Sequence, residues 1–325
     1  MPEIDCSKNI EKKQWNENLS RCKNPSFFSL YEWGEFKSDR WTPLRLSFSK
    51  NSKFIGCTQI LMKKKFGTKF GWASGGINYT DSKYLKEIID NIQEKFKGIF
   101  NIRFNFTETL SGRLSFNISQ IKPLKKAISS INSGFTIISD LKSAPDFLST
   151  MSKNNRYYYK KSLKEGLRFE AEEELRPGSF IQLHNEMVQL KNIKDIKCSL
   201  GEIERLKKFL EGGVKQYSVF HQEKRISTCL ILQTKNTAFY YLAATNEKGR
   251  DLFASFFMVF NLLNSLKSQD VKYFDFGGIT PYKESAKGVN RFKIGFGGEI
   301  KKSLGEFDLS PFNWSRKVFN TVLSP

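Results

Sequence analysis

The first third of the chain has the hydrophobic pattern of a unit that combines strands with a helix. Runs in which apolar and polar residues alternate predict β-strands, and apolar residues spaced three and four apart predict an amphipathic helix. In chain order these patterns predict three strands, a helix and a further strand. The predicted strands are 44–48, 54–62, 70–72 and 102–106, and the predicted helix is 82–97, capped by Asp81 or Ser82.

The same order of elements returns in the second half of the chain. A near-constant offset between corresponding elements indicates two related α/β units. Because a helix joins the last two strands of each unit, that pair of strands is predicted to be parallel and each sheet to be mixed. Three pairs of corresponding residues are 171, 169 and 170 positions apart: Phe54 and Arg225, Phe70 and Phe239, and Phe104 and Phe274. The second set comprises strands at 217–221, 225–233, 238–244 and 272–276, with a helix at 249–267.

The segment between the two sets places the domain boundary. A strand at 135–141 is expected to leave the first domain, so the predicted domains are residues 1–140 and 141–309. The tail, about 310–325, is expected to pack on the first domain. Further predicted elements are helices at 144–165, 178–190 and 202–211, a strand that becomes an acidic loop at 167–175, and a strand at 304–309.

A stripe of cations follows one side of the helix predicted at 144–165. Lys153, Arg156, Lys160 and Lys164 recur at spacings of three and four, which places them on one face of a helix. Such a stripe forms either an anion-binding ridge or a solvated face, and the spacing fits both.

The charge of the whole chain favours anionic partners. The chain has 53 Lys and Arg against 33 Asp and Glu, a net charge of +20. Nucleic acid, phosphorylated substrates and anionic membrane surfaces are the partner classes that this charge fits. A genome that favours lysine codons would give the same composition without any such partner. Disorder over most of the chain is excluded by its content of hydrophobic residues, 39%.

Several classes of enzyme are excluded by what the sequence lacks. The five cysteines form no CxxC pair and are expected to be reduced thiols, and the two histidines, His184 and His221, fit neither a zinc motif nor a Ser-His-Asp set. Neither a P-loop nor a GxGxxG turn occurs. Without a signal peptide or an apolar run long enough to span a bilayer, the protein is expected to be cytoplasmic. Any chemistry is therefore expected from Lys, Arg, Tyr, carboxylates and backbone amides, with no metal and no bound cofactor.

Five short motifs carry a resemblance to a known family. They are SLYEWGEFK at 29–37, WTPLRL at 41–46, YFDFGGI at 273–279, GVNRFKIGFGGE at 288–299 and GEFDL at 305–309. The order of elements resembles the acyl-CoA N-acyltransferase-like fold called GNAT. Two such units in one chain resemble the Fem family (FemABX), the aminoacyl-tRNA-dependent peptidyltransferases that build peptidoglycan cross-bridges. No long heptad run occurs, so the chain resembles the compact form without the family's coiled-coil arm.

The resemblance implies a catalytic role for the Phe-Lys pair in RFKIGFGGE. Lys293 would stabilise the charge that develops on the reacting carbonyl, and Phe292 would wall the site against water. The alternative is a surface lysine that follows a structural phenylalanine. Asp275 ends a predicted strand, where it would accept the proton of the attacking amine, orient a substrate hydroxyl, or cap the turn through Gly277 and Gly278.

Four further residues are candidates for substrate binding. The family lysine at the position of Lys37 contacts acceptor phosphates, which suits a flexible ammonium. Lys191 stands where the family usually carries an arginine for the acceptor, and Tyr241 where family tyrosines line the acceptor channel. Whether Tyr241 or its neighbour Tyr240 faces that channel is left open by the sequence. Arg156 is a candidate as part of the cationic stripe.

Three functions remain in competition on the sequence. The first is transfer of an aminoacyl group from aminoacyl-tRNA to an amine of a phosphate-bearing cell-envelope precursor, with peripheral contact at the inner membrane face. The second is N-acyl transfer from a thioester in a capsule or polysaccharide pathway. A thioester is less favoured, because TNEKGRD at 245–251 has one glycine where GNAT enzymes hold a pyrophosphate on a glycine-rich turn. The third is a non-enzymatic RNA-binding protein with degenerate GNAT-like units.

Overall fold

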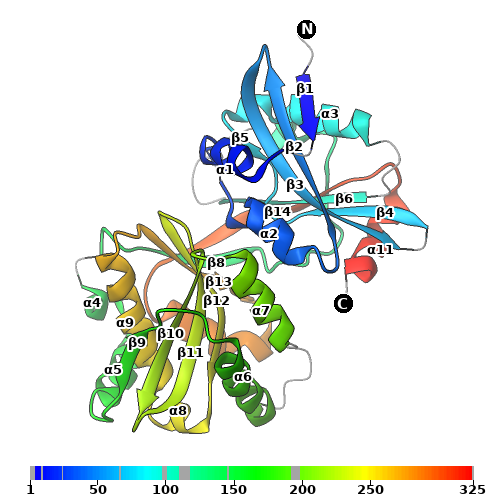
Figure 1. Ribbon diagram of the computed structural model, residues 1–325. Helices are drawn as coiled ribbons and strands as arrows, with labels where there is room; N and C mark the ends of the chain where they lie inside the picture. The colour runs from blue at the N-terminus through cyan, green and yellow to red at the C-terminus, as the bar shows by residue number, and fades with distance from the viewer. Residues whose placement is uncertain are drawn as a thin grey trace. The chain divides into compact units, whose positions relative to one another are not determined.

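Two mixed β-sheets, each with helices packed on it, organise the chain (Figure 1). The computed structural model describes residues 4–8, 10–23, 25–65, 67–96, 101–109, 118–144, 146–191 and 198–323. Contacts divide the chain into a first unit, residues 1–134 with 302–325, and a second unit, residues 135–301. The strand predicted to leave the first domain, β8 (Phe135–Asp140), therefore belongs to the second unit.

The sheet of the first unit has the strand order β1-β2-β3-β4-β6-β14. β4 and β6 are parallel, as predicted for two strands joined by a helix, and the other neighbours are antiparallel. β5 pairs with β3, and β7 pairs with β14. The strands are β1 (Ile4–Lys8), β2 (Thr42–Lys50), β3 (Lys53–Lys65), β4 (Thr68–Ala73), β5 (Asn78–Tyr79), β6 (Asn101–Thr109), β7 (Lys125–Lys126) and β14 (Glu299–Leu309).

Helix α3 (Leu85–Lys95) covers the core of this sheet. Its apolar positions are buried, as their spacing predicts: Leu85, Ile88, Ile89 and Ile92. The predicted helix began at residue 82, where the structure has a short 3-10 turn instead, and its last residue, 97, lies outside the described residues. The other helices are α1 (Lys12–Ser20), η1 (Phe27–Ser29), α2 (Tyr31–Lys37), η2 (Ser82–Tyr84), η3 (Ile118–Ile121) and α11 (Asn313–Leu323).

A buried ion network ties the two ends of the first unit together. Arg103 on β6 is 0% exposed and donates two hydrogen bonds to Asp308 on β14, at 2.7 Å and 3.0 Å. Its third nitrogen donates to Glu306 at 3.3 Å, and Glu306 also accepts from the backbone of Ile131 and Asn132. The carboxylates of the GEFDL motif therefore serve the packing of this unit.

The second unit has the strand order β8-β13-β12-β11-β10-β9. β12 and β13 are parallel, again as predicted, and the remaining neighbours are antiparallel. The strands besides β8 are β9 (Arg168–Ala171), β10 (Val214–His221), β11 (Lys224–Gln233), β12 (Thr237–Thr245) and β13 (Tyr273–Gly278). The helices are α4 (Phe147–Thr150), α5 (Lys153–Ser162), α6 (Pro177–Lys191), α7 (Leu200–Phe209), α8 (Glu247–Asp251), α9 (Ala254–Ser268), η4 (Glu284–Ala286) and α10 (Lys287–Ile294).

The helices of the second unit cover both faces of its sheet (Figure 1). α9 packs on one face, with α4 and α5 beside it, and α6 packs on the other face with α7. Alternate residues of β11 divide between the faces, with Cys229 and Ile231 in the α9 core. Within the described residues, none of the helices is both long and apolar enough to cross a membrane.

Two helices predicted as continuous are broken in the structure. The segment 144–165 forms α4 and α5. The two helices are separated by Met151, which has an extended backbone, and Ser152 caps the N-terminus of α5. The segment 249–267 forms α8 and α9, because Phe253 between them has a φ of 55°. A left-handed backbone at a phenylalanine costs about 1–3 kcal/mol and requires compensating contacts. Both breaks rest on backbone angles that the spacing of apolar residues does not encode.

Candidate active site

The second sheet opens at the ends of its two parallel strands. Residues Thr237–Phe239 of β12 pair with residues Tyr273–Asp275 of β13. The pairing stops there, although both strands continue beyond that point. Asp275 is therefore the last residue of β13 that pairs with β12. A wedge of this kind at the carboxyl ends of parallel strands leaves backbone and side chains accessible to a ligand.

Asp275 is held by two donors on one of its oxygens. Gly277 N donates to Oδ1 at 2.8 Å, and Thr136 Oγ1 on β8 donates to the same atom. Burial raises the pKa of Asp275, while the hydrogen bonds from Thr136 and Gly277 and the charge of Lys293 lower it. Because both donors occupy Oδ1, Oδ2 stays available to accept a proton within the described part of the chain. The turn-capping role expected as one alternative is thus present, and it is compatible with a chemical role.

Lys293 lies on α10, near Asp275. Its ammonium donates to the carbonyl oxygen of Gly278 at 2.9 Å. Burial lowers the pKa of Lys293, and the carboxylate of Asp275 raises it. An ammonium has three donors, so the bond to Gly278 leaves two for a ligand among the described residues. The structure therefore brings the two predicted catalytic residues together, with opposite charges at the open end of the sheet.

Phe292 belongs to an aromatic cluster that fixes α10 against α9. Its ring lies 5.1 Å from Phe256 and 5.1 Å from Phe296, edge to face in both cases. Its backbone oxygen accepts a hydrogen bond of 2.9 Å from Asn155 on α5. Phe292 is only half-buried. The arrangement supports Phe292 as an apolar wall next to Lys293.

Two supporting residues were not found from the sequence. Thr136 and Asn155 lie 139 and 137 residues from their partners Asp275 and Phe292, so no local motif connects them. One signal was present for Asn155, because it shares the inner side of α5 with the buried Tyr159 and Ser162. A buried amide on an inner helix face needs partners, and this one anchors the helix that carries Lys293.

The two neighbouring tyrosines of β12 face opposite sides of the sheet. Tyr240 packs in the α9 core, with its ring 6.0 Å from Phe274. Tyr241 is the extra residue of a β-bulge. Leu230 of β11 pairs with Leu242, and the next residue, Ile231, pairs with Tyr240, so Tyr241 has no partner on β11 in this ladder. Burial raises the pKa of Tyr241, and the charge of Glu202 on α7 adds to this shift. Tyr241 therefore faces the α6–α7 side, whereas Phe292 packs on the α9 side.

The remaining two candidates of the second unit are Lys191 and Arg156. Lys191 is the last residue of α6; burial of its ammonium and the nearby Arg250 lower its pKa. Arg156 is half-buried on α5 and donates to the backbone oxygen of Met151 at 3.3 Å. Neither residue has a contact with Asp275 or Lys293 among the described residues, so their roles in substrate binding stay predictions.

Lys37 belongs to the first unit, at the end of α2. Its ammonium lies 4.4 Å from the centre of the Phe36 ring and 5.0 Å from that of Trp33. Trp33 is buried, and the adjacent Gly34 has no room for a side chain, because a Cβ there would lie 2.4 Å from Gln59 Oε1. The EWG motif thus packs α2 on the sheet and fixes the position of the backbone that carries Lys37.

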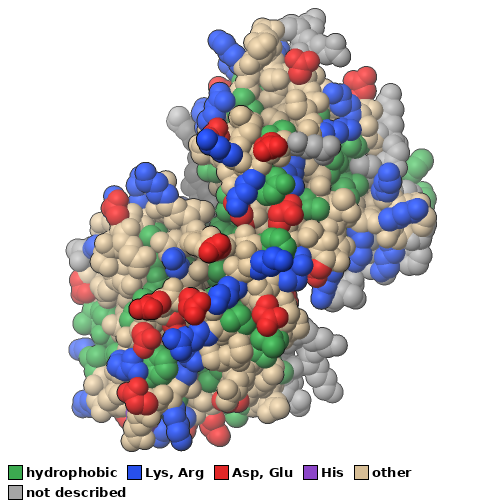
Figure 2. Space-filling model, in the orientation of Figure 1, with side chains coloured by type: hydrophobic (Ala, Val, Ile, Leu, Met, Phe, Trp, Pro, Cys, Tyr) green, Lys and Arg blue, Asp and Glu red, His purple; other side chains and the backbone are tan. Residues whose placement is uncertain are grey.

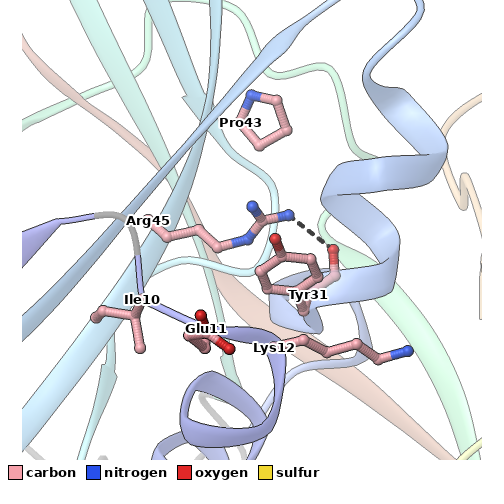
Figure 3. A pocket seen from close by; sticks show the side chains of 6 residues that line it. All are labelled: Ile10, Glu11, Lys12, Tyr31, Pro43 and Arg45. Atoms are coloured by element: carbon pink, nitrogen blue, oxygen red, sulfur yellow. Dashed lines mark hydrogen bonds between the residues drawn. The ribbon is translucent and has the colours of Figure 1, made fainter.

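A hollow of about 410 Å³ lies beside α2 in the same unit (Figure 3). Arg45, 9% exposed, stacks on the Tyr31 ring, and its guanidinium donates to Tyr31 O at 2.9 Å and Glu35 Oε1 at 2.7 Å. Lys12 is likewise paired, with Glu32 at 3.0 Å. Because these cations are matched by carboxylates, the hollow gives no strong preference for an anion. Its lining residues are Ile10, Glu11, Lys12, Tyr31, Pro43 and Arg45.

Comparisons with known proteins agree with this architecture. The model of the FemAB family matches residues 184–322. No curated protein matches the sequence. Among solved structures, FemX superposes with a TM-score of 0.80 at 15% identity, covering 98% of this chain and 100% of that one.

Two further solved structures share the fold. L-PGS from Bacillus licheniformis has a TM-score of 0.60 at 13% identity, with 96% of each chain covered. A tandem GNAT protein from the clavulanic acid biosynthesis pathway has a TM-score of 0.56 at 7% identity, covering 94% of this chain and 98% of that one. The predicted fold, α/β with tandem GNAT-like units, is confirmed. The FemAB family model in residues 184–322 and the similarity to the fold of FemX along the chain both agree with the resemblance to the Fem family that the motifs carry.

Proposed function

We propose that this protein is a transferase that moves an aminoacyl group from aminoacyl-tRNA to an amine of a phosphate-bearing peptidoglycan precursor. The observation that carries the proposal is that Lys293, bonded to Gly278 O, lies close enough to Asp275 for their charges to act on each other, where β12 and β13 part. An aminoacyl ester is already activated, so the protein needs to align the amine with the carbonyl, stabilise the oxyanion and receive a proton. No bound metal or cofactor is required for these steps.

The two residues divide the chemistry between them. The amine nitrogen attacks the ester carbonyl carbon, and the negative charge that forms on the carbonyl oxygen is met by the ammonium of Lys293. Oδ2 of Asp275 accepts the proton that the nitrogen loses. As the tetrahedral intermediate collapses, the carbon–nitrogen bond is kept, the ester carbon–oxygen bond breaks, and the proton passes to the departing ribose oxygen. Phe292 excludes water, which would otherwise hydrolyse the ester.

The segment before α9 favours an ester on tRNA over a thioester such as acetyl-CoA. In GNAT enzymes a glycine-rich turn at this place offers backbone amides to a pyrophosphate. Here the segment forms α8, capped by Asn246, which accepts a hydrogen bond from Gly249 N at 3.0 Å. A Cβ at Gly249 would lie 2.4 Å from the backbone oxygen of Ile226, so this glycine serves the packing of α8 on β11.

A transfer assay with defined donors tests the proposal. The purified protein is incubated with a pool of radiolabelled aminoacyl-tRNAs and a nucleotide-linked peptidoglycan precursor, and the products are separated by mass. We expect label on the precursor, and we expect ribonuclease treatment of the donor to abolish the transfer. Equal transfer from an acyl thioester would favour the capsule-type N-acyltransferase. Binding of tRNA without transfer to any amine would favour the RNA-binding protein.

A further inference from the structure

The exposed side of α5 combines cations with aromatic rings. Lys153 and Lys160 lie four residues before and three residues after Tyr157, so both share its side of α5. Lys164, which the spacing placed on the same stripe, lies beyond the end of α5 at Ser162. Lys161, four residues after Tyr157, lies with its ammonium 4.8 Å from the centre of the Tyr157 ring. From Lys153 to Lys164 the chain has five cations and no carboxylate. We call Tyr157, Lys160, Lys161 and Phe253 the α5 surface.

The cations of this surface lie in a segment without carboxylates. The face drawn in Figure 2 carries Lys and Arg side chains over both units, interleaved with Asp and Glu. The net charge alone therefore does not locate a binding site. Residues 153–162 of α5 include no carboxylate, and Glu165, just past the helix, is the acidic residue that acts on Lys161. A hydrogen bond with the Tyr157 hydroxyl raises the pKa of the Lys161 ammonium.

The rings of the α5 surface are held in place by their neighbours. Tyr158 stacks on Phe253 with 5.1 Å between ring centres and lies edge to face with Tyr157 at 5.4 Å. Tyr157 is nevertheless 53% exposed. Phe253 keeps its position in spite of a left-handed backbone, φ 55°, which a large residue rarely adopts. An observed strain of this kind often marks a functional position.

We propose that the α5 surface binds single-stranded RNA, with unpaired bases stacked on Tyr157 and Phe253 and the phosphates held by Lys160 and Lys161. Stacking platforms flanked by cations are the usual means by which proteins hold single strands without reading their sequence. The inference rests on the proposed function for the source of the RNA, which would be the unpaired end of the aminoacyl-tRNA. α5 also contacts the helix that carries Lys293, because Ser152 N donates to Gly295 O at 2.8 Å. RNA on this surface would thus lie next to α10.

Fluorescence anisotropy with a short labelled single-stranded RNA tests the surface. Tyr157→Ala should weaken binding by about tenfold or more, the loss expected for one stacked base. Tyr157→Phe keeps the ring and should bind nearly as the parent does. Leu163→Ala is the matched control, because Leu163 is 55% exposed on the same segment but has no aromatic face. Equal losses for Tyr157→Ala and Leu163→Ala, or none for either, would overturn the stacking role.

The phosphate contacts are tested through the dependence of binding on salt. Replacing Lys160 and Lys161 together by Glu should flatten the plot of log affinity against log salt, since each lost phosphate contact on a single strand lowers the slope by about 0.7. Lys208→Glu on α7, across the sheet, should leave the slope unchanged. A duplex of the same sequence should bind more weakly than the single strand. Tighter binding of the surface to anionic lipid vesicles than to RNA would overturn the proposal in favour of a membrane contact.

The same variants separate this inference from the proposed function. If transfer from an aminoacyl ester of adenosine proceeds while single-stranded RNA does not bind, the transferase stands and the α5 surface is wrong. If RNA binds through Tyr157 and no aminoacyl transfer occurs from any donor, the surface stands and the transferase is wrong.

Discussion

Replacing Lys293 by methionine separates a catalytic lysine from a structural one. Methionine keeps much of the apolar stem and removes the ammonium. In the resting protein the change removes the bond to Gly278 O, and because Gly278 is exposed, water can replace the donor. The stability loss should therefore stay within the worth of one ordinary hydrogen bond, about 0.5–1.5 kcal/mol.

The loss in turnover should be much larger than the loss in stability. Removing one oxyanion donor typically raises the barrier by about 2.7–4 kcal/mol, a factor of about 10²–10³ in kcat. The effect should fall on kcat rather than on KM for the acceptor, because the charge that Lys293 meets exists only in the transition state. Steady-state transfer kinetics and a thermal melt measure the two effects.

A second lysine of the same helix provides the control. Lys287→Met on α10 removes an exposed ammonium that is paired with Glu284 at 2.8 Å. Its kcat should remain close to that of the parent. If Lys293→Met keeps a near-normal kcat and weakens acceptor binding, Lys293 is a ground-state ligand of the acceptor, and the oxyanion role would pass to backbone amides.

Three further results are expected. Transfer should fall as pH drops through the raised pKa of Asp275 and as pH rises through the lowered pKa of Lys293. Thr136→Val removes a hydrogen bond that lowers the pKa of Asp275, so it should move the acid limb of the pH–rate profile to higher pH. An unmoved acid limb would exclude Asp275 as the titrating group. Arg103→Met should destabilise the first unit by about 3–5 kcal/mol in chemical denaturation, because it removes the buried cation that both Glu306 and Asp308 contact and leaves Asp308 only the longer pair with Arg316 at 3.8 Å. A loss below about 1 kcal/mol would contradict the buried network. Lys37→Glu should weaken binding of a phosphate-bearing acceptor far more than that of a neutral analogue, and equal losses would make Lys37 structural.

The order of strands and the main helix of each unit could be predicted from the sequence because their apolar spacing is long and regular. Helix α10 could not, since it has eight residues, includes Gly288, and buries only Asn290. Lys293 was therefore assigned from its motif rather than from its place on a helix. The proximity of Lys293 to Asp275 depends on tertiary packing, which the spacing of residues along the chain does not predict.

The side of the sheet to which each side chain of β12 points could not be predicted from the sequence, for a different reason. Strict alternation predicts that Tyr240 and Tyr241 point to opposite sides, but the alternation does not say which side each takes. The bulge at Tyr241 shifts the register with β11, so counting from either end of the strand gives different answers. Only the paired strand resolves the ambiguity.

The discontinuous first unit has a consequence for the order in which the protein is completed during synthesis. Strand β6 lies between β4 and β14, and β14 also supplies both carboxylates that neutralise Arg103. Until the ribosome has released residues 302–309, the early-made part of this unit has an unpaired strand edge and an uncompensated cation. The second unit is continuous, so all of its strands from β8 to β13 emerge before β14 does. The usual rule that the N-terminal domain matures first is therefore expected to be reversed, because the second unit can be completed while the first still lacks β14.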